Sequence, residues 1–327
     1  MTKSESSTLS VVVPAYNEAE GLSEFHRRLS AVLDGLSVDW EVLYVNDGSS
    51  DGTLSVISGF NDPRVAIIDL SRNFGKEIAM TAGLDHARGD AVVVIDADLQ
   101  DPPELIPELV RKWREGFDVV YARRTARDGE TLMKKATAKL FYRSIQFLSR
   151  VKIPADTGDF RLLSRRAVEA LKQLREQHRF MKGLFAWIGY PQVAVYYHRD
   201  PRFAGRSKWN YWHLWNFALE GITSFSIGPL KMATYVGLLT AFASFIAAGV
   251  ITYKTIAYGD PVRGYPSLMV VMLFLGGMQL MSLGMIGEYL GRMFNETKRR
   301  PLYLVNRITP SRLGQENGQL TQLFGKH

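Results

Sequence analysis

The first 125 residues of the chain alternate short apolar runs with segments of helical periodicity. Between the runs, apolar residues recur at intervals of three and four, as in the segment Pro103–Glu115 and in the set Leu22, Phe25, Leu29, Val32 and Leu33. Near-continuous apolar strands separated by helices indicate a mostly parallel sheet that is covered by helices on both faces. The predicted strands are Ser10–Val13, Glu41–Val45, Val65–Leu70, Ala91–Ile95 and Asp118–Tyr121.

Two long stretches without charge follow in the C-terminal third of the chain. Met232–Tyr253 and Gly264–Gly287 contain no Asp, Glu, Lys or Arg, and the polar turn Gly259-Asp260-Pro261 separates them. Each stretch exceeds the roughly 20 residues that a helix needs to cross about 30 Å of hydrocarbon. The pattern predicts two transmembrane helices, and a pair of buried core helices is the alternative.

Aromatic residues gather directly before the first of these stretches. The segment Trp209–Ile227 has almost no charge and contains Trp209, Tyr211, Trp212, Trp215, Phe217 and Phe225. This density is typical of an interfacial helix in the headgroup layer of a membrane, although a buried aromatic helix is also compatible with it. We therefore expect an α/β domain over residues 1–207, an interfacial segment over 208–228, two transmembrane helices over 229–292 and a cytoplasmic tail over 293–327.

The basic residues are placed beside the predicted spans. The net charge of the 327 residues is +7, and the flanking basic residues are Arg199, Arg202, Arg206 and Lys208 before the spans and Lys298, Arg299 and Arg300 after them. Because positive residues stay on the cytoplasmic side, we expect an integral plasma-membrane protein with both termini and the domain in the cytoplasm. A basic rim also suits anionic lipid headgroups, so the charge does not require a nucleic-acid partner.

The composition and the N-terminus exclude several kinds of site. The chain has no cysteine, which excludes disulfides, thiolate metal sites and cysteine nucleophiles. The residues Met1–Glu5 begin no apolar leader, so we expect no signal peptide. Neither a GxxxxGK[ST] loop nor a GxGxxG loop after the first strand is found, so ATPase and dinucleotide-oxidoreductase functions lose their main support.

Polar loops follow three of the predicted strands, at Pro14–Glu18, Asn46–Gly52 and Asp96–Asp101. Ligands of such sheets bind beyond the carboxyl ends of the strands. Asp51 is interpreted as a turn or cap residue. Asp96 and Asp98 repel each other unless a cation lies between them, and hard oxygen ligands of this kind suit Mg²⁺ or Mn²⁺, with Gln100 as a further oxygen donor.

The motifs, taken in order, resemble glycosyltransferases of family 2 with the GT-A fold. They are Pro14-x-Tyr16-Asn17-Glu18, Asn46-Asp47-Gly48-Ser49, Asp96-x-Asp98-x-Gln100-Asp101-Pro102-Pro103 and Thr157-Gly158-Asp159-Phe160-Arg161. With Arg202-Phe203-x-Gly205-x-Ser207-Lys208 and two C-terminal spans, the chain closely resembles bacterial polyprenyl-phosphate (bactoprenol) glucosyltransferases, which are related to dolichol-phosphate mannose synthases. The resemblance runs from about residue 8 to residue 305, and it departs at Asn46, where an acidic residue is more usual.

This resemblance implies the inverting transfer of a hexose, with glucose from UDP-glucose preferred, to undecaprenyl or another polyprenyl phosphate at the cytoplasmic membrane face. It implies that Asp159 and Asp98 are catalytic and that Mg²⁺ or Mn²⁺ is held by Asp96, Asp98 and Gln100. The implied nucleotide-sugar residues are Pro14, Tyr16, Glu18, Asp47, Lys76 and Asp96; for Lys76, a solvated lysine at the start of a helix is the alternative. Cations are needed to hold the negative acceptor phosphate, and the expected residues are Arg123, Arg202, Ser207 and Lys208; for the arginines, a charge that reaches to the membrane surface is the alternative.

Other functions stay open at this point. GDP-mannose or another UDP-sugar is an alternative donor, and the chain also has glycines in its spans that permit close packing in a homo-oligomer. A processive polysaccharide synthase is disfavoured because the chain has no Gln-x-x-Arg-Trp motif. A non-catalytic membrane scaffold that binds nucleotide sugars is the alternative from another class, and the retention of Asp96, Asp98 and Asp159 together argues against it.

Overall fold

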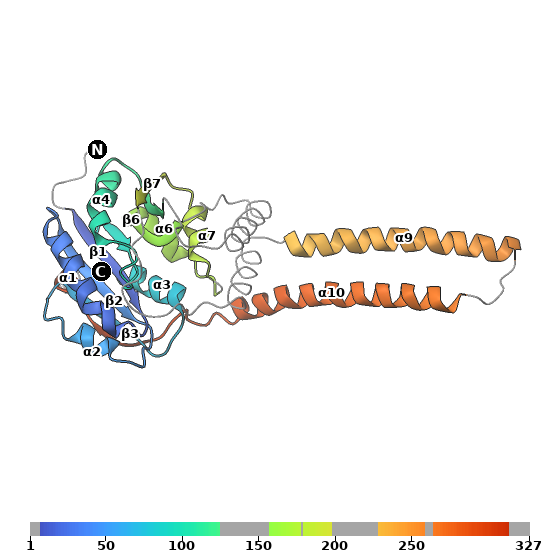
Figure 1. Ribbon diagram of the computed structural model, residues 1–327, viewed down its shortest axis with the longest axis horizontal. Coiled ribbons are helices and arrows are strands. Elements are labelled where there is room, and N and C mark those ends of the chain that lie inside the picture. Colours follow the sequence, from blue (N-terminus) through green and yellow to red (C-terminus); the bar gives the residue numbers. More distant parts are fainter. Residues whose placement is uncertain (1–6, 125–156, 178, 198–227, 259–263, 314–327) are drawn as a thin grey trace, which may run out of the picture.

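A computed structural model describes residues 7–124, 157–177, 179–197, 228–258 and 264–313. An α/β domain is followed by two long helices that extend away from it (Figure 1). The described strands form one sheet in the order β7-β5-β6-β4-β1-β2-β3-β8. The strands are β1 (Thr8–Ala15), β2 (Asp39–Asn46), β3 (Val65–Leu70), β4 (Ala91–Val94), β5 (Val119–Arg124), β6 (Thr157–Ser164), β7 (Gln192–Tyr197) and β8 (Val305–Thr309).

The middle of the sheet is parallel, as the sequence predicts. Strand β1 pairs in parallel with β2 and β4, and β2 pairs in parallel with β3. Strand β6 is antiparallel to both of its neighbours, β4 and β5, and β8 runs antiparallel along β3. The carboxyl ends of β1, β2, β3 and β4 therefore meet at one edge, where the three polar loops begin.

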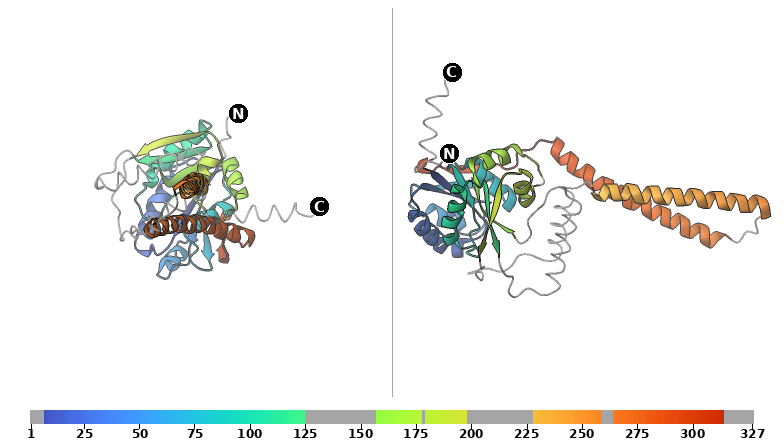
Figure 2. Two further views of the ribbon diagram at one scale, coloured as in Figure 1. Left: turned by 90° about the vertical axis from the view of Figure 1, so that its right-hand side faces the viewer. Right: turned by 90° about the horizontal axis from the view of Figure 1, so that it is seen from above.

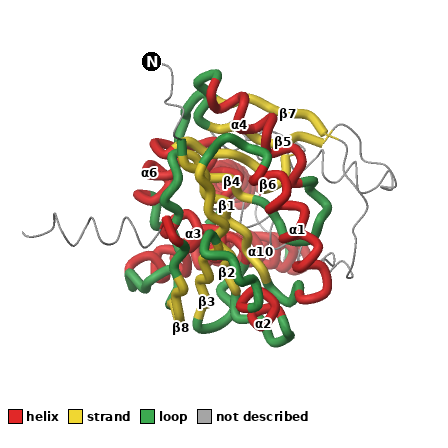
Figure 3. The backbone as a smooth tube through the Cα atoms, turned by 90° about the vertical axis from the view of Figure 1, so that its left-hand side faces the viewer, coloured by secondary structure: helices red, strands yellow, loops and turns green. Residues whose placement is uncertain are grey.

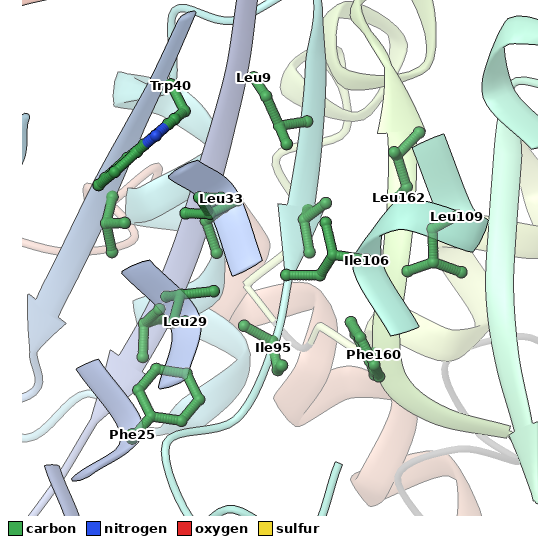
Figure 4. Close-up of a cluster of buried hydrophobic side chains, with 14 of the residues drawn as sticks. Leu9, Phe25, Leu29, Leu33, Trp40, Ile95, Ile106, Leu109, Phe160 and Leu162 are labelled. Carbon is green, nitrogen blue, oxygen red and sulfur yellow. The ribbon is translucent and has the colours of Figure 1, made fainter. Parts of the chain in front are cut away.

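Helices cover both faces of this sheet, as Figure 3 shows. The side chains of β1 alternate between two cores: Val11 and Val13 pack with helices α1 and α4, and Val12 packs with α3, α6 and α7. Figure 4 shows part of the first core, including Phe25, Leu29 and Leu33 of α1. The helices of the domain are α1 (Ala19–Asp34), α2 (Thr53–Ser58), α3 (Lys76–His86), the 3₁₀ helix η1 (Pro103–Leu105), α4 (Ile106–Arg114), α6 (Arg165–Gln173) and α7 (Met181–Trp187).

The helical periodicity is confirmed at α1 and α4. Of the five apolar residues predicted to share one face of α1, four are buried, and Val32 is partly buried against the same core. The segment predicted as one helix over Pro103–Glu115 begins with η1 and continues as α4. Helix α3 approaches the sheet closely at Gly83, where a Cβ atom would lie 2.2 Å from Val12 Cγ1. A side chain at residue 83 would push α3, and with it the residue that begins α3, Lys76, away from the sheet.

The two uncharged stretches form helices α9 (Gly228–Tyr258) and α10 (Tyr265–Thr297), which lie side by side and point away from the sheet (Figures 1 and 2). Helix α10 continues five residues beyond the expected boundary at 292. Over the described parts of the chain, no helix is both long and apolar enough to cross a membrane. The interfacial segment predicted over 208–228 lies outside the described residues, apart from Gly228.

After α10 the chain returns to the domain. Strand β8 adds to the edge of the sheet beside β3, although the periodicity of the polar tail does not predict a strand there. Four of its five residues are exposed, so it has no run of buried apolar residues that would reveal it. The region predicted as a tail over 293–327 thus contains the end of a helix and a strand of the sheet.

Candidate functional site

The loops after β1 and β2 are joined by hydrogen bonds. Asn17 N donates to Ser49 Oγ at 3.1 Å, and Ser50 N donates to Asn17 Oδ1 at 2.9 Å. Asn17 has a φ of 54°, a left-handed conformation that asparagine adopts more readily than most residues. Glu18 N donates to Thr53 Oγ1, and Tyr16 is 38% exposed. Tyr16 and Glu18, predicted to bind the nucleotide sugar, therefore belong to a loop that is hydrogen-bonded to the segment after β2.

Asp47 links the loop after β2 to the loop after β3. Its buried carboxylate accepts hydrogen bonds from Phe74 N at 2.7 Å and from Gly75 N at 2.9 Å. Burial raises the pKa of Asp47, and the two backbone donors oppose that shift. Next to it, Gly48 has a φ of +63°, and a Cβ atom there would lie 2.4 Å from the carbonyl carbon of Arg72. The two loops pack so tightly that only glycine fits at residue 48.

Asp51, Pro14 and Asn46 lie around these loops. Asp51 accepts hydrogen bonds from Thr53 N at 2.9 Å and Ala19 N at 3.3 Å, which confirms its interpretation as a turn residue. Pro14 is buried at the end of β1, in register with Val45 of β2. The side chain of Asn46 donates through Nδ2 to Asp69 Oδ1 at 2.7 Å.

Lys76 connects two carboxylates that the sequence places in separate motifs. Its Nζ lies 2.7 Å from Asp96 Oδ2 and 2.5 Å from Asp159 Oδ2. Burial opposes the charge of the ammonium group, but Asp159 and Asp96 raise the pKa of Lys76. Lys76 follows the loop held by Asp47, Asp96 follows β4 and Asp159 lies on β6, so the fold brings the predicted donor, metal and catalytic residues to one place.

The pKa values of the Asp96 and Asp159 carboxyl groups are shifted in opposite directions. Burial raises the pKa of Asp96, although Lys76 opposes this shift. Burial also disfavours the charge of Asp159, but Lys76 and Lys182 hold the pKa of Asp159 well below its usual range. The Asp159 side chain is 12% exposed, and its Oδ1 is buried without a hydrogen-bond partner among the described residues. An anionic oxygen with no donor suits a group that receives a substrate or a cation.

Arg161 holds the backbone at Asp159. Its NH2 group donates to Gly158 O at 2.8 Å, its Nε donates to Asp159 O at 3.2 Å, and its guanidinium lies 3.8 Å from the centre of the Phe185 ring. Desolvation lowers the pKa of Arg161 to about 10, so it stays charged at neutral pH. The motif predicted Asp159 as functional but gave no supporting role for Arg161.

Glu77 and Lys182 were also missed by the sequence. Burial and the charge of Asp159 raise the pKa of Glu77 to about 7, and Glu77 Oε2 accepts a hydrogen bond from Met181 N at 3.2 Å. Lys182 acts on both Glu77 and Asp159 through its charge. The only sequence signal for Glu77 was its place next to Lys76, and α7, which carries Lys182, is more than 100 residues away.

The loop after β4 forms a tight turn. Asp98 Oδ1 accepts a hydrogen bond from Gln100 N at 3.1 Å, and Leu99 between them has a φ of 58°. A left-handed conformation costs a residue of this kind about 1–2 kcal/mol. The Leu99 side chain is only 2% exposed in the core, and Asp101 accepts a hydrogen bond from Tyr197. These anchors hold Asp98 and Gln100, both partly exposed, in a fixed turn beside Asp96.

The residues expected to bind the lipid phosphate are only partly described. Arg123 on β5 pairs in backbone register with Thr157, two residues before Asp159, and its guanidinium lies 5.7 Å from the Tyr196 ring. Arg202, Ser207 and Lys208 lie outside the described residues. The structure therefore puts Arg123 beside the strand that carries Asp159, and the other three assignments stay predictions.

The predicted metal ligands supply part of the coordination that a divalent cation needs. Asp96, Asp98 and Gln100 offer hard oxygen atoms from one turn, and the orphaned Asp159 oxygen lies in the same cluster. Across the described ranges, no three Asp, Glu or His side chains converge to form a metal site on their own. Mg²⁺ at nucleotide sites is commonly held by one or two carboxylates together with substrate phosphates, and this donor set matches that pattern.

The chain matches two family models. Residues 10–172 match the model described as glycosyl transferase family 2, and residues 219–293 match the model described as GtrB C-terminal hairpin. The first match contains Asp47, Lys76, Asp96 and Asp159, and the second contains α9 and most of α10.

Curated relatives match over nearly their whole length. An uncharacterized glycosyltransferase of Synechocystis sp. is 57% identical over 300 residues, which cover 91% of this chain and 94% of the relative. A bactoprenol glucosyl transferase of Shigella phage SfX is 48% identical over 299 residues, which cover 91% of this chain and 98% of the relative.

Among solved structures, glucosyl-3-phosphoglycerate synthase from Mycobacterium tuberculosis, in complex with Mn²⁺, UDP-glucose and phosphoglyceric acid, is 22% identical with a TM-score of 0.45. That similarity covers 66% of this chain and 78% of the other. The described sheet, with its carboxylates after β4 and on β6, agrees with the GT-A fold that the motifs imply. By its motif order, its family match and its extensive identity to curated relatives, the chain belongs to glycosyl transferase family 2 and is a glycosyltransferase.

Proposed function

We propose that the enzyme transfers glucose from UDP-glucose to a polyprenyl phosphate at the cytoplasmic face of the membrane. The observation that carries this proposal is the cluster of Lys76, Asp96 and Asp159 beside the Asp47 loop, at the carboxyl ends of the parallel strands. The names of relatives at 47–48% identity, which include bactoprenol glucosyl transferases, support glucose and a polyprenyl acceptor.

The proposed subsite for the sugar donor is formed by the loops after β1, β2 and β3. Pro14 and Asp47 are buried at the ends of β1 and β2, and Tyr16 and Glu18 are exposed or partly exposed in the loop beside them. We place the nucleoside against this loop and the diphosphate beside Lys76. Asp47 is held by two backbone donors. The base then meets a loop that needs little reordering, which reduces the entropy cost of binding.

A divalent cation would be held by Asp96, Asp98 and Gln100, with the remaining ligands from the diphosphate of the donor. When bound, Mg²⁺ or Mn²⁺ supplies positive charge that stabilises the departing nucleoside diphosphate. Lys76 contributes a second positive charge in the same region, which its pKa keeps fully ionised at neutral pH. Lys76 can bind either the carboxylates or the diphosphate, because its side chain is 43% exposed and has a flexible stem.

The reaction is a single displacement at the anomeric carbon. An oxygen of the acceptor phosphate forms a bond to C1 of glucose while the bond from C1 to the diphosphate breaks, and UDP leaves with the electron pair. A phosphate monoester has a second pKa near 6, so its oxygen is largely anionic at neutral pH and needs little help from a base. Asp159, kept ionised by Lys76 and Lys182, orients the acceptor and stabilises positive charge on the sugar ring. One displacement inverts the centre and gives a β-linked product.

We assign α9 and α10 to the membrane, as two spans with both termini in the cytoplasm. Their described surfaces expose large apolar side chains, which include Leu238, Leu239, Phe242, Leu280, Met281 and Leu283. Large exposed apolar side chains along two helices suit a surface that is covered by protein or lipid. The match of residues 219–293 to the GtrB C-terminal hairpin supports a role shared with relatives. Arg123, Arg202, Ser207 and Lys208 would then hold the acceptor phosphate near the membrane surface.

The test is a donor panel. Purified full-length protein is incubated with undecaprenyl phosphate, Mn²⁺ and one labelled donor at a time: UDP-glucose, UDP-galactose, UDP-N-acetylglucosamine or GDP-mannose. We expect label in the organic phase chiefly with UDP-glucose. The Asp159→Asn variant should form labelled lipid at less than about 1% of the wild-type rate. Label from GDP-mannose instead would replace the donor assignment. Donor binding without product from any donor would favour the scaffold function.

A further inference from the structure

Strand β8 brings a side chain from the C-terminal segment to the donor loops. Figure 3 shows β8 at the edge of the sheet beside β3. Asn306 Nδ2 of β8 donates to Asp69 Oδ2 at 2.7 Å, and Asn46 Nδ2 of β2 donates to Asp69 Oδ1, also at 2.7 Å. Asp69 is only 8% exposed, so both of its carboxylate oxygens are bound in a largely water-excluded position. Hydrogen bonds to a charged acceptor in such a place are stronger than neutral ones.

This bridge ends at the residue before Asp47. Asn46 Oδ1 accepts a hydrogen bond from Ser49 N at 3.3 Å, so the amide of Asn46 joins Asp69 to the turn that contains Asp47 and Gly48. The bridge also explains why an amide stands at residue 46. An aspartate there would place a second carboxylate against Asp69 and would supply no hydrogen-bond donor, and like charges in a buried position repel strongly.

The same C-terminal segment also holds the loop after β3. Ser71 N donates to Leu304 O at 2.9 Å, three residues before Phe74, whose backbone N–H binds Asp47. Leu304 and Asn306 therefore connect β8 to both loops of the proposed donor subsite. Lys76 directly follows Phe74 and Gly75, and its ammonium group extends the connection to Asp96 and Asp159.

Contacts on either side of β8 fasten it to the domain. Before the strand, Tyr303 Oη donates to Asp85 Oδ2 at 2.9 Å. After it, Ser311 donates to the buried carboxylate of Glu41, and Arg312 N donates to Pro63 O at 2.7 Å. The end of α10 is tied down as well, because Gln177 N donates to Glu296 Oε1 at 2.7 Å. The segment after the helical hairpin is thus an integral part of the domain.

We infer that Asn306 and Asp69 are positioning residues of the donor site: the strand that follows the helical hairpin sets the orientation of the Asn46–Asp47 turn and therefore the affinity for the nucleotide. The inference rests on the proposed function only in taking a uridine nucleotide as the ligand. Neither Asn306 nor Asp69 contacts the ligand in this account. They act through Asn46.

The experiment uses an exchange of the two side chains in the full-length protein. Asn306→Asp places two carboxylates face to face, and we expect it to weaken UDP binding about tenfold, with kcat at saturating donor unchanged within twofold. The double variant Asp69→Asn with Asn306→Asp restores the pattern, because Asn at residue 69 accepts from Asn46 and donates to Asp at residue 306. We expect its affinity to return to within about threefold of the wild type. Arg307→Gln, which changes the charge of the same strand by the same amount, is the matched control and should bind UDP normally.

A second readout needs no ligand. Amide hydrogen exchange of the segment 71–76 should speed up in Asn306→Asp, because the N–H groups that bind Asp47 are less firmly held, and it should return to the wild-type rate in the double variant. Unchanged exchange and unchanged UDP affinity in Asn306→Asp, or a loss that the double variant does not restore, would overturn the inference. If the wild-type protein binds no UDP while Asn306→Asp still shows the faster exchange, the proposed function is contradicted and the positioning role stands.

Discussion

The ammonium group of Lys76 lies 2.5 Å from Asp159 Oδ2, although the two residues are 83 positions apart in the chain. The same ammonium group lies 2.7 Å from Asp96 Oδ2. This contact joins the first residue of α3, the loop after β4 and strand β6. It makes Lys76 the central cation of the candidate active site.

Replacing Lys76 by Met should lower kcat/KM by at least about 10²-fold, the scale of losing one well-placed electrostatic stabiliser. The acidic limb of the pH–rate profile should also move to higher pH, because Lys76 helps to hold the pKa of Asp159 low. Lys112→Met is the matched control, since Lys112 forms an exposed ion pair with Glu115 on α4. A Lys76→Met enzyme with the rate and pH profile of the control would remove Lys76 from the site.

Chelation should abolish transfer. We expect EDTA to stop product formation and Mn²⁺ or Mg²⁺ to restore it, because Asp96, Asp98 and Gln100 are proposed to hold the cation on the donor diphosphate. Asp98→Asn should lower turnover at least about 10²-fold. Asp51→Asn serves as the control, because Asp51 closes a turn with Thr53. Full activity in chelator, measured as labelled glycolipid, would contradict the metal assignment.

The raised pKa of Glu77 predicts that the free energy of unfolding of the protein without substrates depends on pH. Burial raises the pKa of Glu77 to about 7 from an ordinary value of 4.5, so the folded protein binds a proton that the unfolded chain releases. Its contribution to stability is therefore complete below pH 4.5 and is lost as the pH rises toward 7. Compared with the wild type, Glu77→Gln should gain several degrees in Tm between pH 5 and pH 8. A difference in Tm that is constant across this range would show that Glu77 titrates normally.

The membrane assignment predicts the sides on which reporters are found. A reporter fused after His327 should be active in the cytoplasm, and one inserted at Asp260 should be active outside, because the basic flanks of the helices stay inside. Cytoplasmic activity at both positions would contradict two spans. Both reporter fusions must be in frame and must leave β8 and Ser311 intact, because these residues belong to the domain.

The sequence predicts the part of the fold that has strong periodicity. Strands β1 to β4 and helix α1 have buried apolar residues at regular spacing; the bounds of the four strands are confirmed within two residues, and α1 contains the five residues predicted for its apolar face. Strands β6 and β7 are not predicted, because the segment in which they lie is basic and only weakly periodic. Strand β8 is mostly exposed and gains its place from backbone pairing with β3, which leaves no apolar pattern in the sequence.

The site is predicted as a set of residues, and its connections come only from the fold. Motif order indicates Asp47, Asp96 and Asp159, but spacing along the chain does not reveal that Lys76 bridges the last two. Arg161 and Glu77 escape notice because each acts through a neighbour: Arg161 binds the backbone at Asp159, and Glu77 responds to the charge of Asp159. Asn46 departs from the acidic residue that is usual in the family, and its hydrogen bond to Asp69, a residue on another strand, explains the difference.

The most direct test of the account is the anomeric configuration of the glycolipid. Purified enzyme is incubated with UDP-glucose that carries ¹³C at C1, together with Mn²⁺ and undecaprenyl phosphate, and the extracted lipid is examined by NMR for the coupling constants of the anomeric proton. We expect a single β-linked glucosyl phosphate, made by the wild type and at a much lower rate by Asp159→Asn. An α-linked product, or no glucosylated lipid from a protein that binds UDP-glucose, would contradict a single displacement by the acceptor phosphate.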